Sequence, residues 1–298
     1  MLDTKNFLDS LSIPYSENFS AKKLCSFRTG GEVAIAVQPR NCEQIKSVLD
    51  FLKKNNKKHI VLGRGSNVVF PDGKYCGAVV LTHGLDGIKR DGNTVCAGAG
   101  VTLTALARFA EENSLTGLEF AHGIPGSVGG GIYMNAGAYG GELSNSLVLC
   151  ECYDCESGNF LKLENSECDF SYRHSVFQNN KDLIVLSARF ELDFGDKSKI
   201  RQRMNELKAA RTEKQPLEYP SAGSTFKRPE GYFAGKLIED CGLKGFRIGG
   251  AAVSEKHAGF VINTGGATAS DVKETVEHIK NTVFEKFGVS LECEIEFI

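Results

Sequence analysis

The sequence predicts a globular protein that mixes helices with strands, and three observations support this. Apolar residues recur at helical spacing in some segments and alternate with polar residues in others. The chain has 298 residues, of which 41% are hydrophobic, so it can bury a large core and is long enough for two domains. Its 33 glycines, roughly a tenth of the chain, indicate many sharp turns or close approaches of backbone to a ligand.

Helical spacing of apolar residues predicts four helices. One covers residues 41–56, and another covers residues 103–112, with Thr102 as its N-terminal cap. A third carries Ile200, Met204 and Leu207 on one face. The last helix is expected to bury a face made of Val272, Val276, Ile279, Val283 and Phe287.

Short apolar or alternating runs predict the strands. They lie at residues 59–62, at 68–70, on either side of 156–159, and at 183–192. A C-terminal strand is expected to turn one set of side chains inward: Val289, Leu291, Cys293, Ile295 and Phe297. Glu292, Glu294 and Glu296 would then point outward. The change of pattern at residues 193–199 indicates a domain boundary.

Charge and composition exclude several classes of protein. With 35 Lys and Arg against 37 Asp and Glu, the net charge is −2, so the chain has no basic surface for nucleic acid or anionic membranes. The N-terminal residues do not resemble a signal peptide, and no segment approaches the roughly 20 apolar residues of a membrane span. We therefore expect a cytoplasmic protein.

The ten cysteines are predicted to be reduced thiols that fill small apolar sites. Cys150, Cys152, Cys155 and Cys168 suggest zinc, but a second closely spaced pair is absent. The six histidines contain no H-x-x-x-H pair. We therefore expect no metal site.

Two glycine-rich loops are the strongest candidates for a ligand site. The first, Gly63 to Asn67 (GRGSN), joins two predicted strands, whereas a Rossmann fingerprint opens a helix. Glycines allow several backbone N–H groups to converge on a diphosphate, so the loop is typical of a dinucleotide cradle. The second loop, Gly123 to Gly141, has the same composition. The alternative is a tight, glycine-packed crossing between two layers.

Polar side chains elsewhere suggest catalysis, each with a simpler alternative. Arg173 could clamp a carboxylate, or it could be a surface arginine stacked on Tyr172. Ser224 lies in a small-residue loop that could approach a ligand, although such serines are often only turn residues. The three C-terminal glutamates would repel one another if covered, and would be a solvated edge if exposed.

In combination, these segments resemble the family of UDP-N-acetylenolpyruvoylglucosamine reductases over nearly the whole chain. Eight motifs carry the resemblance: SFRTGG at 26–31, LGRGSN at 62–67, GIPGSVGG at 123–130, MNAGAYGGE at 134–142, FSYRHSVF at 170–177, PSAGSTFKRP at 220–229, GLKGFRIGGAAVSEKHAGFVIN at 242–263 and LECEIEFI at 291–298. One such motif could occur by chance, but all eight in order could not.

The resemblance implies an α+β fold with an FAD-binding domain of the vanillyl-alcohol-oxidase type in two lobes, and a smaller substrate domain. We expect the lobes at residues 1–85 and 86–196 and the substrate domain at 197–298, with the C-terminal strand returning to the active site. The implied enzyme is a monomeric flavoprotein of peptidoglycan synthesis. It uses non-covalent FAD, with NADPH as hydride donor, to reduce UDP-N-acetylglucosamine enolpyruvate to UDP-N-acetylmuramate.

The resemblance also implies roles for individual residues. Ser224 would be the proton donor, and Arg173 and Glu294 would stabilise the intermediate. Residues matching cofactor contacts are Gly63, Arg64, Gly65, Ser66, Asn67, Ile124, Pro125, Gly126, Ser127, Gly129, Gly130, Asn135, Ala136 and Gly137. Substrate contacts are expected at Arg211, Lys214, Lys227 and Arg228, and Lys227 or Lys214 could also assist Ser224.

The chain departs from part of the family pattern, and other functions remain open at this level. It is similar to the shorter form, which lacks a tyrosine lid insertion; Arg228 replaces an asparagine of the longer form, and Glu296 replaces a more frequent arginine. An oxygen-using flavin oxidase of the same fold is one alternative, although Ser66 stands where many such enzymes attach FAD to histidine. A non-catalytic UDP-sugar binder is the other.

Overall fold

The computed structural model describes residues 2–298, which divide into two compact units. Unit 1 comprises the residues up to 17, residues 35–64 and residues 77–210. Unit 2 comprises residues 18–34, 65–76 and 211–298. Each unit is therefore built from segments that are far apart in the sequence, and the first glycine loop crosses the boundary between residues 64 and 65.

A four-stranded sheet contains the first strands of the chain. Its order is β1 (Tyr15–Ser20), β2 (Glu32–Val37), β5 (Tyr75–Leu81) and β3 (His59–Leu62), with β3 parallel to β5. Helix α2 (Cys42–Lys54) begins at Asn41, whose side chain accepts a hydrogen bond from the amide of Gln44. The buried face of α2 packs into one core with apolar residues of β2 and β5. Helix α1 (Leu2–Ser10) lies beside α2, because Phe7 stacks on Phe51.

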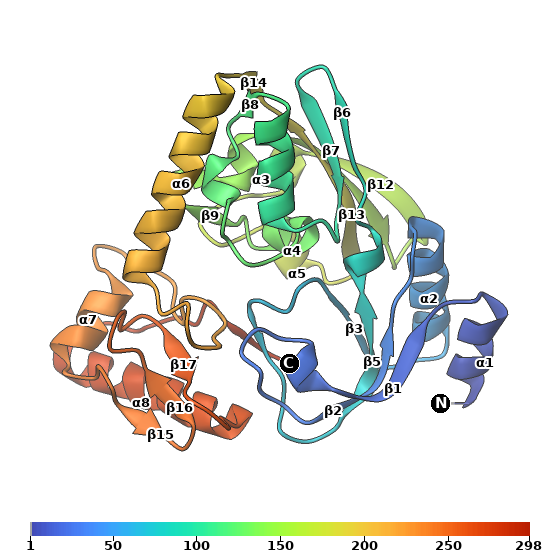
Figure 1. Ribbon diagram of the computed structural model, residues 1–298. Helices are drawn as coiled ribbons and strands as arrows, with labels where there is room; N and C mark the ends of the chain where they lie inside the picture. Colours follow the sequence, from blue (N-terminus) through green and yellow to red (C-terminus); the bar gives the residue numbers. More distant parts are fainter. Residues whose placement is uncertain (1) are drawn as a thin grey trace. The chain divides into compact units, whose positions relative to one another are not determined.

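Unit 1 contains a five-stranded antiparallel sheet (Figure 1). Its order is β12 (Asn159–Glu164), β11 (Leu147–Asp154), β13 (Leu183–Glu191), β7 (Thr94–Gly98) and β6 (Ile88–Asp91). Helices α3 (Leu103–Glu112) and α4 (Val128–Tyr133) pack against each other, and α4 contacts β13 and β7. The long helix α6 (Lys197–Lys214) adds Ile200, Met204 and Leu207 to the same core.

Smaller elements complete unit 1. The short strand pairs are β9 (Gly137–Ala138) with β10 (Gly141–Glu142), and β8 (Leu115–Thr116) with β14 (Asp193–Phe194). Helix α5 (Val176–Asn179) follows the segment that carries Arg173. The 3-10 helices of the chain are Ala21–Lys23, Thr82–Gly84, Glu119–Ala121, Leu143–Asn145 and Asn165–Glu167.

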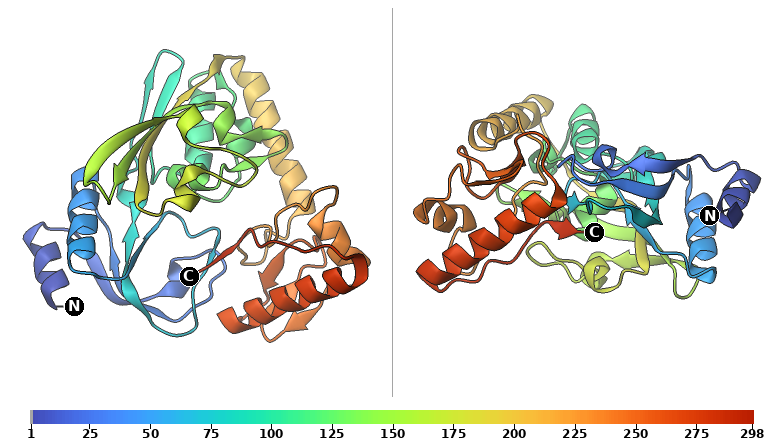
Figure 2. Two further views of the ribbon diagram at one scale, coloured as in Figure 1. Left: turned by 180° about the vertical axis from the view of Figure 1, so that it is seen from behind. Right: turned by 90° about the horizontal axis from the view of Figure 1, so that it is seen from below.

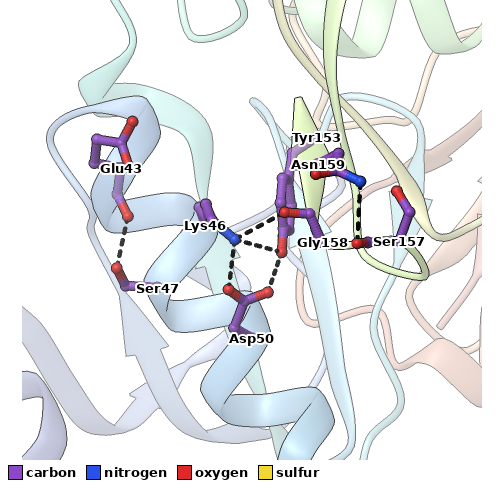
Figure 3. A network of polar contacts seen from close by, with 8 residues as sticks. All are labelled: Glu43, Lys46, Ser47, Asp50, Tyr153, Ser157, Gly158 and Asn159. Atoms are coloured by element: carbon purple, nitrogen blue, oxygen red, sulfur yellow. Dashed lines mark hydrogen bonds and ion pairs between the residues drawn. The ribbon is translucent and has the colours of Figure 1, made fainter. Parts of the chain in front are cut away.

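A polar cluster ties α2 to the turn between β11 and β12 (Figure 3). The Nζ of Lys46 donates to Asp50 Oδ2 at 2.8 Å and to the Gly158 carbonyl at 3.0 Å, and it contacts the hydroxyl of Tyr153 at 3.3 Å. The Tyr153 hydroxyl donates to Asp50. Burial of this ring, followed by the Asp50 hydrogen bond, raises the pKa of Tyr153 to about 12. The phenol therefore stays protonated and can donate at neutral pH.

Unit 2 contains a small antiparallel sheet in the order β15 (Arg247–Ile248), β16 (Ala251–Val253) and β17 (Val261–Asn263). Helix α8 (Ala269–Phe287) runs along this sheet and contacts α7 (Ala234–Asp240) (Figure 2). A capping box between Thr268 and Asp271 starts α8, and Gly288 ends it at φ 67°. Strand β4 (Val68–Val69) pairs in parallel with β18 (Glu296–Phe297).

Most predicted elements are confirmed, including the helix over residues 103–112 and its Thr102 cap. Three expectations are wrong. The C-terminal segment forms a strand only at residues 296–297, with an isolated bridge at Cys293, and Phe297 is exposed rather than inward. Phe287 is also exposed and is the last residue of α8, which ends at Gly288. The second glycine loop contains helix α4, which was not among the predicted helices.

Within residues 2–298, no helix is long and apolar enough to cross a membrane. All ten cysteines are free thiols, and five of them are buried: Cys25, Cys150, Cys152, Cys155 and Cys168. In the same part of the chain, no three His, Cys, Asp or Glu side chains are grouped in a way that could hold a metal ion.

Candidate active site

The first glycine loop has a backbone shape that only glycine tolerates at its centre. Gly65 has φ 60°, and a Cβ at this position would lie 1.9 Å from the carbonyl oxygen of Leu24. The carbonyl of Gly65 accepts a hydrogen bond from the amide of Ser26 at 3.0 Å. The SFRTGG motif therefore packs directly against this loop and holds its shape.

The amides of this loop are available to a ligand. In the part of the chain that the structure describes, no backbone carbonyl accepts a hydrogen bond from the N–H groups of Arg64, Gly65 and Ser66. Successive amides around a residue with positive φ form a concave donor site for anions. The loop can therefore offer these amides to an anionic ligand.

Several residues of the second glycine loop pack closely against their neighbours. The amides of Val128 and Gly129 donate to the carbonyls of Val101 and Ala99, at 2.8 and 2.9 Å. A Cβ at Gly129 would lie 2.9 Å from Ala99 Cβ, and one at Gly131 would lie 2.7 Å from Leu143 Cδ1. These glycines let α4 approach its neighbours closely, which was the alternative that the sequence left open.

The two loops meet at Gly63. A Cβ on Gly63 would lie 2.4 Å from the Oγ of Ser127, the buried N-terminal cap of α4. On the other side, Nε2 of His83 lies 2.9 Å from the Gly63 carbonyl. Burial, with a smaller effect of the Arg64 charge, lowers the pKa of His83, so the neutral ring can donate to this carbonyl. As an isolated histidine, His83 carried no sequence signal of this role.

Arg173 is joined to the second loop within unit 1. Its Nη2 donates to the carbonyl of Gly137 at 3.0 Å, and its guanidinium lies 5.1 Å from the ring centroid of Tyr172. Asn135 is fully buried; its Nδ2 donates to the carbonyl of Ser171, and its Oδ1 accepts from the amide of Ser144. Arg173 and Asn135 both have positive φ, at 55° and 41°. The half-buried Arg173 thus lies over Tyr172 and also contacts the second glycine loop, so the stacking alternative does not exclude the carboxylate-binding hypothesis.

Ser224 and Glu294 are held close in register within unit 2. The amide of Glu294 donates to the carbonyl of Thr225 at 2.9 Å, and Phe226 forms a β-bridge with Cys293. Thr225 is buried, and its hydroxyl accepts from the amide of Val261 at 2.9 Å. Ser224 and Glu294 themselves are half-buried, so both side chains reach the surface of a well-anchored backbone.

The C-terminal segment also holds the first glycine loop. Nδ2 of Asn67 donates to the Glu294 carbonyl, and the amide of Glu296 donates to the Asn67 carbonyl, both at 2.9 Å. Glu294 and Glu296 are half-buried while Glu292 is exposed, so the three carboxylates are not one solvated row. This arrangement brings residues from three separate motifs together in unit 2.

The four cationic residues predicted to bind the substrate lie in different environments. Lys227 is ion-paired with Glu292 at 2.5 Å, so its charge is directed at that carboxylate. Arg228 is exposed, and its guanidinium lies 4.8 Å from the ring centroid of Phe233. Arg211 and Lys214 occupy the last turn of α6, where cations interact favourably with the helix dipole.

Two family profiles match separate parts of the chain. The profile described as "FAD binding domain" matches residues 33–164. The profile described as "UDP-N-acetylenolpyruvoylglucosamine reductase, C-terminal domain" matches residues 215–298.

Similar proteins are named as the same reductase over nearly their full length. The UDP-N-acetylenolpyruvoylglucosamine reductase of Clostridium novyi (strain NT) is 49% identical over 281 residues, covering 94% of this chain and 91% of the relative. That of Caldicellulosiruptor bescii is 45% identical over 299 residues, covering 100% and 95%. The crystal structure of the reductase from Thermus caldophilus matches with a TM-score of 0.80 and 33% identity, over 96% of this chain and 98% of that one.

A more distant structure, an alkyldihydroxyacetonephosphate synthase, shares only the fold, with a TM-score of 0.50 and 13% identity over 65% of this chain and 44% of that one. These findings confirm the α+β FAD-binding fold of the vanillyl-alcohol-oxidase type and favour neither the oxidase nor the non-catalytic binder. High identity over nearly the full length identifies the protein family. The chain belongs to the UDP-N-acetylenolpyruvoylglucosamine reductases.

Proposed function

We propose that this protein reduces the enolpyruvyl ether of UDP-N-acetylglucosamine enolpyruvate to UDP-N-acetylmuramate, with FAD and NADPH. Membership of the reductase family supports the reaction. The observation that carries it is the backbone register of unit 2, which holds Ser224, Glu294 and the first glycine loop in one hydrogen-bonded assembly. A proton donor, an anion-stabilising group and a cofactor loop are the parts that such a reduction needs.

The residues of the first loop would hold the FAD diphosphate through the amides of Arg64, Gly65 and Ser66. Bound there, FAD would supply the redox chemistry of the reaction, the transfer of a hydride from NADPH to the methylene carbon of the enolpyruvyl group. From the second loop we expect cofactor contacts at Ile124, Pro125, Gly126, Ser127, Gly129, Gly130, Asn135, Ala136 and Gly137. The buried side chains of Ser127 and Asn135 favour contacts through the backbone at these two positions.

Arg173 and Glu294 would stabilise the charge that develops on the substrate carboxylate during reduction. A guanidinium suits this role, because it stays cationic and can bind a carboxylate through two N–H groups. Arg173 is already held by the Gly137 carbonyl, so little reorganisation is needed. Removing a stabilising group of this kind typically costs about 10²- to 10³-fold in rate.

Ser224 would donate a proton to the carbon adjacent to the carboxylate and so set the lactyl stereocentre. Lys227 lies three residues beyond Ser224 but is paired with Glu292, so Lys214 stays the other candidate for assisting the serine. Arg211, Lys214, Lys227 and Arg228 would bind the anionic groups of the sugar nucleotide.

We further propose a cytoplasmic, monomeric enzyme of peptidoglycan precursor synthesis. Ten free thiols are consistent with a reducing compartment. We also propose a division into residues 1–85, 86–196 and 197–298. The family profiles match residues 33–164 and 215–298, which is compatible with a boundary between residues 165 and 214.

Anaerobic spectroscopy of the purified protein tests this function. A yellow sample should bleach on addition of NADPH, and its colour should return without oxygen when UDP-N-acetylglucosamine enolpyruvate is added. Mass spectrometry should then find UDP-N-acetylmuramate. Colour that returns only with oxygen would support the oxidase instead.

A further inference from the structure

The segment that carries Arg173 is attached to the second glycine loop by Gln178, a residue with no role in the function proposed above. Its Nε2 lies 2.9 Å from the carbonyl oxygen of Arg173 and 2.9 Å from that of Tyr133, the last residue of α4. The same nitrogen lies 3.6 Å from Sδ of Met134. A primary amide has two N–H donors, so both carbonyls can be satisfied at once.

Arg173 needs such support because of its backbone. Its φ of 55° is a conformation that residues with side chains rarely adopt without surrounding contacts. The turn is closed by paired backbone hydrogen bonds between Ser171 and His174, at 3.1 and 3.3 Å. The hydrogen bond from Gln178 then holds the Arg173 carbonyl, and therefore the peptide that leaves the strained residue.

The contacts of Gln178 connect Arg173 to the second glycine loop. Tyr133 comes two residues before Asn135, and Gly137, which accepts from the Arg173 guanidinium, comes two residues after it. The Arg173 guanidinium is thus fixed by its hydrogen bond to Gly137, and the Arg173 carbonyl is fixed by Gln178. Gln178 and the guanidinium both contact the same stretch of the second glycine loop. A misplacement of about 1 Å at such a group can cost on the order of 10²-fold in rate.

We propose that Gln178 is a positioning residue that sets the Arg173 guanidinium against the second glycine loop, and this rests on the role proposed for Arg173. It acts through Arg173 and does not itself touch the reacting atoms. Ser175 is fully buried and also donates to the Tyr133 carbonyl, at 2.7 Å. Replacing Gln178 should therefore leave the segment folded while loosening Arg173.

The test measures both half-reactions of the flavin-loaded enzyme by anaerobic stopped flow. Gln178→Leu removes the donors, Gln178→Glu keeps the shape without them, and Gln178→Lys restores N–H donors. Gln202→Leu is the matched control, because Gln202 is an exposed glutamine of α6 that pairs with Glu206. Each change at Gln178 is also made in an Arg173→Ala background.

We expect Gln178→Leu and Gln178→Glu to slow reoxidation by UDP-N-acetylglucosamine enolpyruvate about 10- to 100-fold. Flavin reduction by NADPH should stay within about 2-fold, and Gln178→Lys should recover most of the lost rate. In the Arg173→Ala background the same changes should cost less than about 3-fold, because residues that act as a unit are not additive.

Equal slowing of both half-reactions, or an equal loss in both backgrounds, would reduce Gln178 to a structural role and overturn the inference. Unchanged reoxidation in all three variants would do the same. The proposed function fails separately, if the sugar nucleotide does not reoxidise the wild-type flavin at all.

Discussion

The side chain of Asn67 donates a hydrogen bond to the backbone carbonyl of Glu294 at 2.9 Å, across 227 positions of the sequence. The Glu296 amide returns a hydrogen bond to the Asn67 carbonyl, and β4 and β18 pair directly after it. The C-terminus of the chain is therefore the structural partner of the first glycine loop. This contact, and the surroundings of Gly65, Ser224 and Tyr153, each predict a measurable outcome.

Asn67→Asp should weaken FAD binding and shift the position of Glu294. The carboxylate keeps the shape of the side chain but cannot donate to the Glu294 carbonyl, and it brings negative charge to a loop that would hold a diphosphate. Leaving that carbonyl unsatisfied typically costs about 1–3 kcal/mol. Fluorescence titration of the apoprotein with FAD measures the effect. Asn281→Asp is the control, because Asn281 is exposed on α8, and equal affinity in both variants would refute the argument.

Gly65→Ala should abolish FAD retention. The added Cβ would lie 1.9 Å from the Leu24 carbonyl oxygen, so the loop must open and its amides must diverge. The flavin content of the purified protein measures this directly. Gly73→Ala tests the same substitution where no heavy atom lies within 4 Å of the added Cβ. Full flavin content in Gly65→Ala would show that this backbone shape is not needed.

Ser224→Ala should leave flavin reduction by NADPH nearly unchanged while slowing reoxidation by the sugar nucleotide. General acid catalysis by a positioned side chain is worth about 10²- to 10⁴-fold, and alanine cannot donate a proton. Stopped-flow spectroscopy separates the two steps, with Ser290→Ala as an exposed control in the same unit. Normal reoxidation in Ser224→Ala would assign the proton donor to another group.

Alkaline pH should destabilise unit 1 through Tyr153. Its pKa is raised to about 12 in the folded protein, by burial and by the Asp50 hydrogen bond, against about 10 in the unfolded chain. The folded state therefore holds a proton that the unfolded state has lost, so this stability is complete below pH ~10 and is lost as pH rises toward ~12. The pKa of Lys46 is also raised, chiefly by its hydrogen bond to Asp50, and acts in the same direction.

Thermal unfolding of the wild type and of Tyr153→Phe between pH 9 and 12 tests this expectation. The variant should start with a lower midpoint and lose less of it across the alkaline range, since it has no phenol to ionise. Tyr232→Phe is the control, because Tyr232 is 48% exposed. Parallel curves for all three proteins would exclude Tyr153 as the titrating group.

Hydrophobic periodicity predicted an element well where one face of the element is buried and the other is exposed. Ile45, Val48, Leu49 and Leu52 are spaced for one helical face, and all four are buried in α2. The C-terminal strand was predicted to be too long, because alternation shows only which side chains could share a face. Pairing needs a partner strand, and within residues 2–298 a partner exists only for residues 296–297 and at the Phe226–Cys293 bridge.

Glycine content predicted a ligand-binding first loop but could not separate binding from packing in the second. The amides of Val128 and Gly129 are occupied by carbonyls of Val101 and Ala99, which lie nearly thirty residues earlier in the chain. Gln178 and His83 were missed because a single polar residue has no periodicity or spacing. Their roles depend on which backbone carbonyl the fold brings within about 3 Å.

The sequence by itself determined the longer helices α2, α3, α6 and α8, the strands β3, β11, β12 and β13, the family and the residue types available for chemistry, because these depend on local spacing and on motifs in order. Only the tertiary structure decided which backbone amides near Gly65 have no backbone acceptor and which amides of α4 are hydrogen-bonded. It also decided which side chains hold Arg173 and Glu294. The physical reason is that backbone hydrogen-bond partners are assigned by contacts between distant segments. Asn67 and Glu294 meet only when the chain is folded.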